Sequence, residues 1–156
     1  MEQTSDIPIE FRDRRNEALV SVWWTGTLLR KAFRRLFKDT FRSEGQFNLL
    51  RVLFYAEEEQ TQSDLARQLL VDKSNITMLL DGLEERGLLK RVRSDRDRRV
   101  HNVCLTEKGK RLLIKTEEIY SNSIRIIMED FSPEDLADLT ALTRKLRSGM
   151  KENDLL

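Results

Sequence analysis

The segment Thr61–Thr106 reads TQSDLARQLLVDKSNITMLLDGLEERGLLKRVRSDRDRRVHNVCLT, and the rest of the chain is interpreted outward from it. Its first half predicts two short helices, separated by residues 70–72, which are enough for a sharp turn and for nothing longer. Its second half predicts two strands, over 88–93 and 100–105, joined by a charged tip. Two helices at a tight turn, followed by a hairpin, are the layout of a winged helix-turn-helix.

Local signals mark the ends of both predicted helices. Thr61 is followed three residues later by Asp64, a spacing at which each side chain satisfies a free backbone amide of the first turn. Asp72 is placed to cap the second helix, and Gly87 is typical of the residue that ends one. The second helix is therefore expected to run from Asp72 to Arg86.

This second helix has an apolar face and a polar face. Its predicted buried stripe consists of Ile76, Leu79, Leu80 and Leu83. At roughly 100° per residue, the opposite face carries Ser74, Thr77, Met78 and Asp81, with Lys73 and Asn75 on the flanks. Small hydroxyl and amide side chains suit a helix that enters the major groove of DNA and hydrogen-bonds to base edges. Each of these residues is also ordinary on a helix surface, so the prediction depends on the whole set.

The predicted hairpin carries an excess of positive charge. Residues 86–99 contain the anions Asp95 and Asp97 and seven cations, which are Arg86, Lys90, Arg91, Arg93, Arg96, Arg98 and Arg99. Such a density is the electrostatic footprint of phosphate binding, although solvated surfaces also show it. Arg96 or Arg98 at the tip is expected to enter the narrow minor groove. In the alternative interpretation, the two aspartates neutralise the tip.

A long helix is predicted before this segment, from Pro8 to about Lys38. Its apolar residues form two adjacent rows, one of Leu19, Val22, Trp23, Leu29, Phe33, Leu36 and Phe37, and one of Val20, Trp24, Leu28 and Ala32. One packing partner cannot cover so wide a face. The helix is therefore expected either to be buried on two sides within one subunit or to pack partly on a second subunit.

Three more helices are predicted around the segment. One begins at Ser43 and has the inward positions Phe47, Leu50, Val52, Leu53 and Phe54, and the acidic run 57–60 that follows is expected to be a solvated loop. Another runs from Thr106 to about Phe131, and the last starts at Ser132-Pro133. Helices at both chain ends, outside the helix-turn-helix, are expected to build a dimer interface.

Composition excludes several classes of protein. The 156 residues suit one domain, and 28 Lys and Arg against 27 Asp and Glu give a net charge of +1, which favours no particular partner. Cys104 is the only cysteine of the sequence, so an intramolecular disulfide is impossible. The first residues do not resemble a signal peptide, and the longest uncharged run, 18–29, is too short to span a bilayer. We therefore expect a cytoplasmic protein without a membrane partner.

The sequence offers no catalytic, cofactor or metal site. Its glycines, at 26, 45, 82, 87, 109 and 149, form no nucleotide-binding pattern. His101 and Cys104 lie three apart in a predicted strand, so they point to opposite faces and cannot easily share a metal ion. No nucleophile is paired with a base. An enzyme is therefore not expected.

Five motifs give the chain a family resemblance. They are Leu65-Ala, Val71-Asp-Lys-Ser-Asn-Ile-Thr, Leu83-Glu-Glu-Arg-Gly-Leu-Leu-Lys-Arg, Asp95-Arg-Asp-Arg-Arg and Leu105-Thr-Glu-Lys-Gly. In this order and spacing they closely resemble the MarR (multiple antibiotic resistance regulator) family of bacterial transcription factors. Ser132-Pro-Glu-Asp-Leu also matches, so the resemblance covers roughly the whole chain from the first long helix onward.

The resemblance implies a mainly α (α+β) fold with a winged helix-turn-helix at 41–106 and a helical dimerisation region at 1–40 and 107–156. It also implies a homodimer on pseudo-palindromic double-stranded DNA, usually a repressor that a small aromatic or lipophilic effector releases. The effector pocket would be lined by Trp23, Trp24 and Phe47, although aromatic residues at this spacing are also common in cores. The expected DNA contacts are Thr61, Gln62, Ser63, Lys73, Ser74, Asn75, Thr77, Met78, Asp81, Arg93, Arg96, Arg98 and Arg99.

Two other classes stay open at this point. The first is a protein-interaction module that uses the winged fold as an adaptor, against which the arginine-rich hairpin argues. The second is a ligand-sensing or metal-sensing protein in which DNA binding is secondary. A gel-shift with the gene's own upstream DNA separates the first class from a DNA-binding regulator, and titration with aromatic carboxylates or zinc tests the second.

Overall fold

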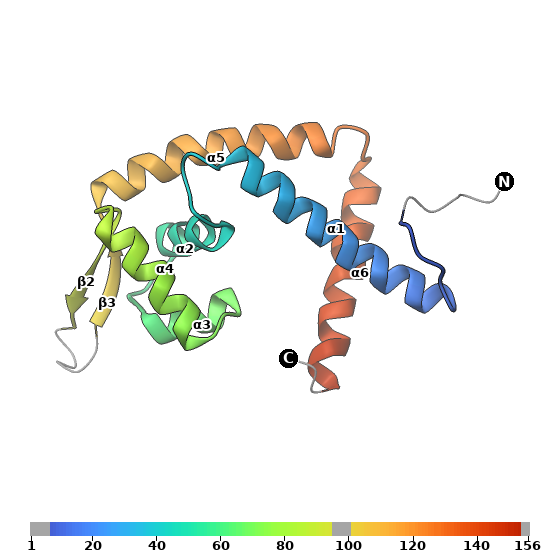
Figure 1. Cartoon of the computed structure of the whole chain (residues 1–156), viewed down its shortest axis with the longest axis horizontal. Coiled ribbons are helices and arrows are strands. Elements are labelled where there is room, and N and C mark those ends of the chain that lie inside the picture. Colours follow the sequence, from blue (N-terminus) through green and yellow to red (C-terminus); the bar gives the residue numbers. More distant parts are fainter. Residues whose placement is uncertain (1–6, 95–100, 154–156) are drawn as a thin grey trace. The chain divides into compact units, whose positions relative to one another are not determined.

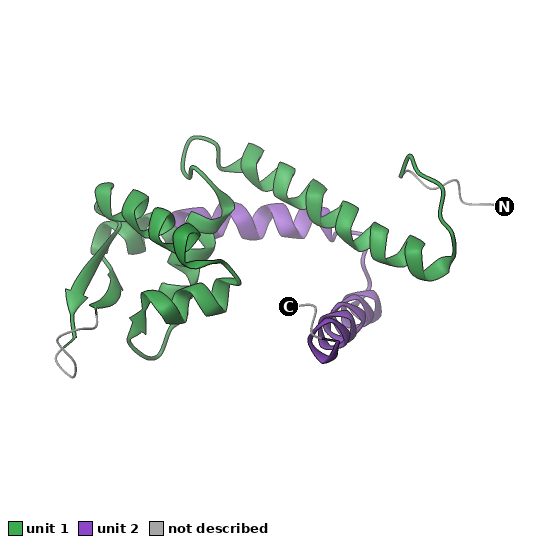
Figure 2. Ribbon diagram, turned by 60° about the horizontal axis from the view of Figure 1, so that its bottom comes forward, with its two compact units in different colours: residues 1–113 green, residues 114–156 purple. Residues whose placement is uncertain are grey.

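The computed structural model describes residues 7–94 and 101–153 (Figure 1). Within these ranges the elements are α1 (Arg14–Leu36), α2 (Glu44–Tyr55), β1 (Gln60–Thr61), α3 (Gln62–Leu69), α4 (Lys73–Glu85), β2 (Leu89–Arg93), β3 (His101–Leu105), α5 (Glu107–Ile127) and α6 (Pro133–Glu152). The predicted winged helix-turn-helix and the predicted mainly α (α+β) class are confirmed. The chain divides into two compact units, residues 1–113 and residues 114–156, which Figure 2 shows in different colours.

Helices α2, α3 and α4 pack together in the first unit and enclose its core. The predicted stripe on α4 is confirmed, because Ile76, Leu79, Leu80 and Leu83 are all buried. On α2 the prediction is partly wrong. Phe54 lies in the last turn, where it is exposed and contacts the Tyr55 ring edge-on at 5.2 Å between centroids.

The turn between α3 and α4 has the predicted length, since α3 ends at Leu69 and α4 begins at Lys73. Leu70 forms the turn with a φ of 53°, in the left-handed region that favours glycine. Its amide and that of Val71 donate to carbonyls of the last turn of α3, which closes the end of this helix.

The sheet has the strand order β1-β3-β2, and both pairs are antiparallel. The predicted hairpin pairs from Leu89 opposite Leu105 to Arg93 opposite His101. The sequence does not predict strand β1, because the acidic run 57–60 indicates a solvated loop. A strand of two residues carries no alternation signal, and Gln60 pairs with Val103, which only the tertiary fold brings beside it.

Helix α1 is shorter than predicted, since it begins at Arg14 and not at Pro8. The physical reason is the carboxylate of Asp13, which accepts from the amides of Arg15 and Asn16 at 2.7 and 2.9 Å and so caps the helix there. Several of its apolar side chains are exposed, including Leu19, Val22, Trp23, Leu28 and Leu29.

A phenylalanine cluster joins the end of α1 to α2. The ring of Phe37 lies 4.6 Å from that of Phe33 and 5.2 Å from that of Phe47, and Phe41 lies 5.6 Å from Phe47. Phe37 and Phe47 are almost completely covered. The connection between α1 and α2 is therefore held by aromatic packing.

The second unit contains the C-terminal part of α5 and all of α6. Helix α5 ends at Ile127, a few residues before the predicted end at Phe131. The predicted start of α6 is confirmed, because Ser132 and Asp135 form a reciprocal capping box with Pro133 at the first position. Among the helices of residues 7–94 and 101–153, none combines the length with the hydropathy that a membrane span requires.

Gly109 lets the first turn of α5 approach the base of β2. A β-carbon at this position would lie 2.0 Å from the carbonyl oxygen of Leu88, an atom that also accepts from the Thr106 amide at 3.1 Å. We expect Gly109→Ala to lower the free energy of unfolding by about 1–3 kcal/mol, measured by urea titration, because the backbone must shift. Gly149→Ala is the matched control, since its β-carbon meets nothing within 4 Å. Equal effects of both substitutions would contradict this explanation.

Candidate nucleic-acid interface

The N-terminus of α4 presents short polar side chains on a capped first turn. The carboxylate of Asp72 accepts from the Asn75 amide at 2.9 Å and from the Ser74 hydroxyl at 2.8 Å. These bonds hold the pKa of Asp72 below its ordinary value. Lys73, Ser74 and Asn75 are exposed, as a helix that enters a groove requires.

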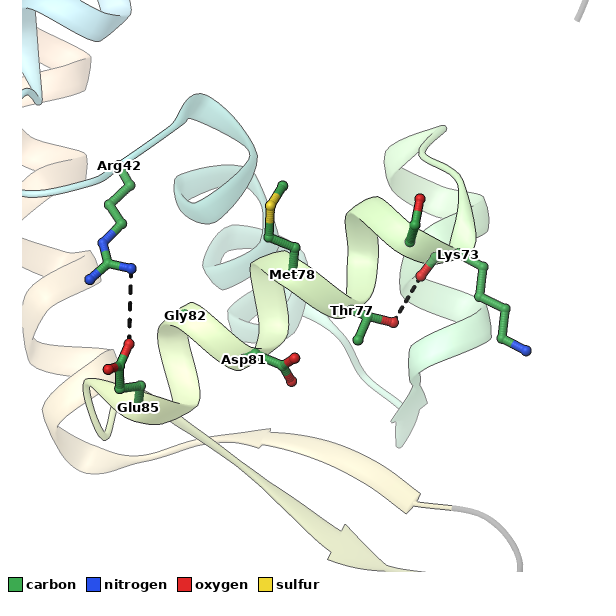
Figure 3. A pocket seen from close by; sticks show the side chains of 8 residues that line it. Arg42, Lys73, Thr77, Met78, Asp81, Gly82 and Glu85 are labelled. Atoms are coloured by element: carbon green, nitrogen blue, oxygen red, sulfur yellow. Dashed lines mark hydrogen bonds and ion pairs between the residues drawn. The ribbon is translucent and has the colours of Figure 1, made fainter.

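An open groove of about 950 Å³ follows the outer face of α4 (Figure 3). It gathers five of the predicted DNA contacts, which are Lys73, Ser74, Thr77, Met78 and Asp81. Met78 is the most hydrophobic of them and is 64% exposed. An apolar side chain held outward in this way suits contact with the methyl group of thymine.

Sequence reasoning missed three further residues of this groove. Gly82 and Glu85 lie on α4, and Arg42 precedes α2 and reaches the groove from there. Arg42 lies 3.9 Å from the carboxylate of Glu85, as the dashed line in Figure 3 shows. No periodicity could have found Arg42, because it belongs to another part of the sequence.

Thr77 is not free, although it was predicted to face outward. Its hydroxyl donates to the Lys73 carbonyl at 2.8 Å and accepts from the side-chain amide of Gln62 at 2.6 Å. Gln62 opens α3, where Thr61 and Asp64 form the predicted capping box. The contact therefore joins the start of α3 to α4, and Ser63 beside it is exposed.

Arg91 is bound internally, so it is not a free cation of the basic hairpin. Its guanidinium bonds to the carboxylate of Glu84 and, at 2.6 Å, to that of Asp81. Partial burial lowers the pKa of Arg91, but the bonds to Asp81 and Glu84 outweigh this and raise it overall. Asp81 therefore borders the groove as half of an ion pair.

Arg86 is also engaged within the fold. Its guanidinium donates to the Thr40 carbonyl at 2.7 Å and to the side chain of Gln46 at 3.4 Å, and it lies 5.9 Å from the centre of the Phe41 ring. Gln46 is 3% exposed, so these contacts also satisfy a buried amide. They tie the end of α4 to the connection between α1 and α2.

The wing is the hairpin of β2 and β3, and on it the structure describes one of the four predicted arginines. Arg93 is exposed at the end of β2, opposite His101 of β3. Arg96, Arg98 and Arg99 lie outside the described residues, as do the aspartates predicted to pair with them. Their role in DNA binding stays a prediction.

The residues predicted to line an effector pocket differ in exposure. Trp23 is 63% exposed on α1, and Trp24 beside it is half-buried. Phe47 is completely covered within the phenylalanine cluster of this chain. Over residues 7–94 and 101–153, no group of three or more His, Cys, Asp or Glu side chains is placed to hold a metal ion.

Comparison with known proteins gives this groove its context. A family model described as "MarR family" matches residues 43–101, which include α2, α3, α4 and β2. Residues 43–101 form a MarR-family domain. The chain carrying it is a transcriptional regulator and not an enzyme.

The similarity to solved structures covers much more of the chain than the MarR-family domain does. The transcriptional regulator BldR from Sulfolobus solfataricus is 26% identical, with a TM-score of 0.75 over 90% of this chain and 99% of that one. A MepR–DNA complex from S. aureus has 20% identity and a TM-score of 0.75, over 83% and 93% of the two chains. PcaV from Streptomyces coelicolor, in complex with its natural ligand, has 22% identity and a TM-score of 0.68, over 80% and 89%.

The cap at the start of α4 makes stability depend on pH. The pKa of Asp72 is lowered in the folded chain, so its contribution is complete above the ordinary value of 3.8 and is lost as the pH falls through the lower folded value. Asn is an equally good cap that does not titrate. Urea titrations at neutral pH and at about pH 3 give the free energy of unfolding at each pH. We expect this free energy to fall less between the two pH values in Asp72→Asn than in the wild type. Equal losses would show that ionisation of this carboxylate adds nothing to stability.

Proposed function

We propose that this regulator is a homodimeric repressor that binds a pseudo-palindromic operator and releases it when a small aromatic or lipophilic molecule binds. The observation that carries the proposal is the groove along α4, where Lys73, Ser74, Thr77 and Met78 line an open surface at the outer face of a helix-turn-helix. This is the arrangement in which a helix reads base edges in the major groove. The DNA in the MepR complex supports the same use of this fold.

In the proposed complex, the contacts divide by chemistry. Thr61, Gln62 and Ser63 at the start of α3 contact the DNA backbone and fix the register, and Lys73 of α4 contacts a phosphate. Ser74, Asn75, Thr77 and Met78 of α4 meet base edges or phosphates in the major groove. Arg93, Arg96, Arg98 and Arg99 on the wing supply positive charge toward the phosphates and the minor groove.

The dimer and the effector are the further parts of this proposal. We place the DNA-binding region at 41–106 and the dimerisation region at 1–40 and 107–156. The exposed apolar side chains of α1 and α6, such as Trp23, Leu29 and Leu142, support a second subunit as the surface that covers them. The natural ligand in the PcaV complex supports a small-molecule effector. Trp23 and Trp24 are the proposed lining of the effector pocket, together with Phe47, which is fully covered in this chain.

The first test is the salt dependence of DNA binding. We expect the wild type to shift the DNA upstream of its own gene in a gel.

Lys73→Ala and Arg93→Ala should each weaken binding and lower the slope of log affinity against log salt by about one, because each removes one phosphate contact. Arg96→Ala and Arg98→Ala should do the same. Lys115→Ala is the control, since Lys115 is exposed on α5 and does not line the groove. Unchanged slopes in all four variants would contradict the interface.

The second test is the footprint on the operator. Two α4 helices of a symmetric dimer should protect half-sites whose centres lie about 10 bp apart, or a multiple of that, because each helix enters the major groove on the same side of the duplex. Hydroxyl-radical footprinting measures this spacing, and sedimentation gives the mass of the bound species. Protection of a single asymmetric half-site by a monomer would rule out the dimer.

A further inference from the structure

We propose that Arg91 is a positioning residue for DNA reading, which holds the carboxylates of Asp81 and Glu84 and so fixes the wing strand β2 against the recognition helix α4. This inference rests on the proposed function, and it adds a residue outside the set of expected DNA contacts. Arg91 would act through α4 and β2 and not by touching DNA.

The contacts of Arg91 close a second connection between α4 and β2. At the base, the Leu88 amide donates to the Leu83 carbonyl at 3.0 Å. Farther along β2, the Arg91 backbone amide donates to one oxygen of Glu84 at 2.9 Å, and its guanidinium bonds to the other. With the contact to Asp81 at 2.6 Å, one residue of the strand is tied to two successive turns of the helix. Attachment at separated points restricts the direction in which the wing leaves α4.

Exposure indicates which partner faces outward. The Arg91 side chain is 24% exposed, whereas that of Asp81 is 60% exposed and borders the groove. A guanidinium that is shielded and engaged by two carboxylates is poorly placed to bind a phosphate as well. Asp81, in contrast, lies on the surface that DNA would approach.

The charges explain why this position requires an arginine. Asp81 and Glu84 bring two negative charges to a helix that must approach a polyanion, and unpaired they would repel phosphates. Arg91 offsets one of these charges and binds both carboxylates at once. Lysine carries the same charge, but on a single ammonium group. It cannot reproduce the planar guanidinium, whose separate N–H groups bind two carboxylates at once.

The test compares Arg91→Met in two backgrounds, the wild type and Asp81→Asn/Glu84→Gln. Binding to a duplex carrying the upstream region of the gene is measured by fluorescence anisotropy over a series of salt concentrations. We expect Arg91→Met to weaken binding about tenfold in the wild type and less than about twofold in the double variant, because the carboxylates that need Arg91 are then gone. The salt slope should fall by clearly less than one, since no phosphate contact is lost.

Two further variants separate positioning from phosphate contact. Arg91→Lys should weaken binding nearly as much as Arg91→Met, although it keeps the charge. Arg93→Met is the matched control two residues along the same strand, and it should lower the slope by about one and act equally in both backgrounds. If Arg91→Met lowers the slope by about one and acts equally in both backgrounds, Arg91 binds phosphate and the inference is wrong. If it has no effect in either background, the inference is also wrong.

A readout without DNA separates failure of this inference from failure of the proposed function. Amide hydrogen exchange in β2 should be about fivefold faster in Arg91→Met and Arg91→Lys than in the wild type, with α6 as the internal reference. Circular dichroism melts confirm that the variants are folded. If the wild type binds no upstream DNA, the proposed function fails whatever the exchange rates are. If the wild type binds DNA but β2 exchanges equally in all variants, Arg91 does not hold the wing.

Discussion

The groove on the outer face of α4 depends on the burial of the opposite face of this helix. Ile76, Leu80 and Leu83 are fully covered by the core, and full burial of such a side chain contributes about 1.5–3 kcal/mol. A rotation of α4 that exposed two of them would cost more than the outer polar contacts return, since a hydrogen bond contributes only about 0.5–1.5 kcal/mol net. Hydrophobic packing therefore decides that Ser74, Met78 and Asp81 face outward.

Electrostatics then divides the arginines of the MarR-family domain into two groups. Arg86 and Arg91 are engaged by carbonyl, amide and carboxylate groups of the fold, and both connect α4 to its neighbours. Arg93 is exposed at the end of β2. The count of seven cations between residues 86 and 99 thus overstates the charge available to a phosphate backbone, because internal pairs neutralise part of it.

The helices outside the MarR-family domain present a different kind of surface. Trp23 and Leu29 on α1 are more than half exposed, and so is Leu142 on α6. Large apolar side chains that stay in contact with water contribute little to the stability of a helix. Exposed apolar surfaces of this kind typically mark protein–protein contacts. The chain thus carries a polar groove on α4 and exposed apolar side chains on α1 and α6, which is the combination that the proposed dimeric regulator needs.

The sequence by itself determined the features that depend on neighbouring residues. The capping box at Thr61, the N-cap at Ser132, the cap at Asp72 and the length of the turn after Leu69 are as predicted, because each depends on residues only a few positions apart. The apolar stripe of α4 can also be predicted from the sequence, since helical periodicity alone places its residues on one side of the helix.

Only the tertiary structure decided the rest. It placed Arg42 beside the groove, joined Gln62 to Thr77, paired β1 with β3 and turned Arg91 onto Asp81 and Glu84. These contacts join residues from different elements, and their side-chain directions follow from how the helices and strands pack. The spacing of residues in the sequence predicts which of them share a face of a helix or strand. It does not predict which other element packs against that face.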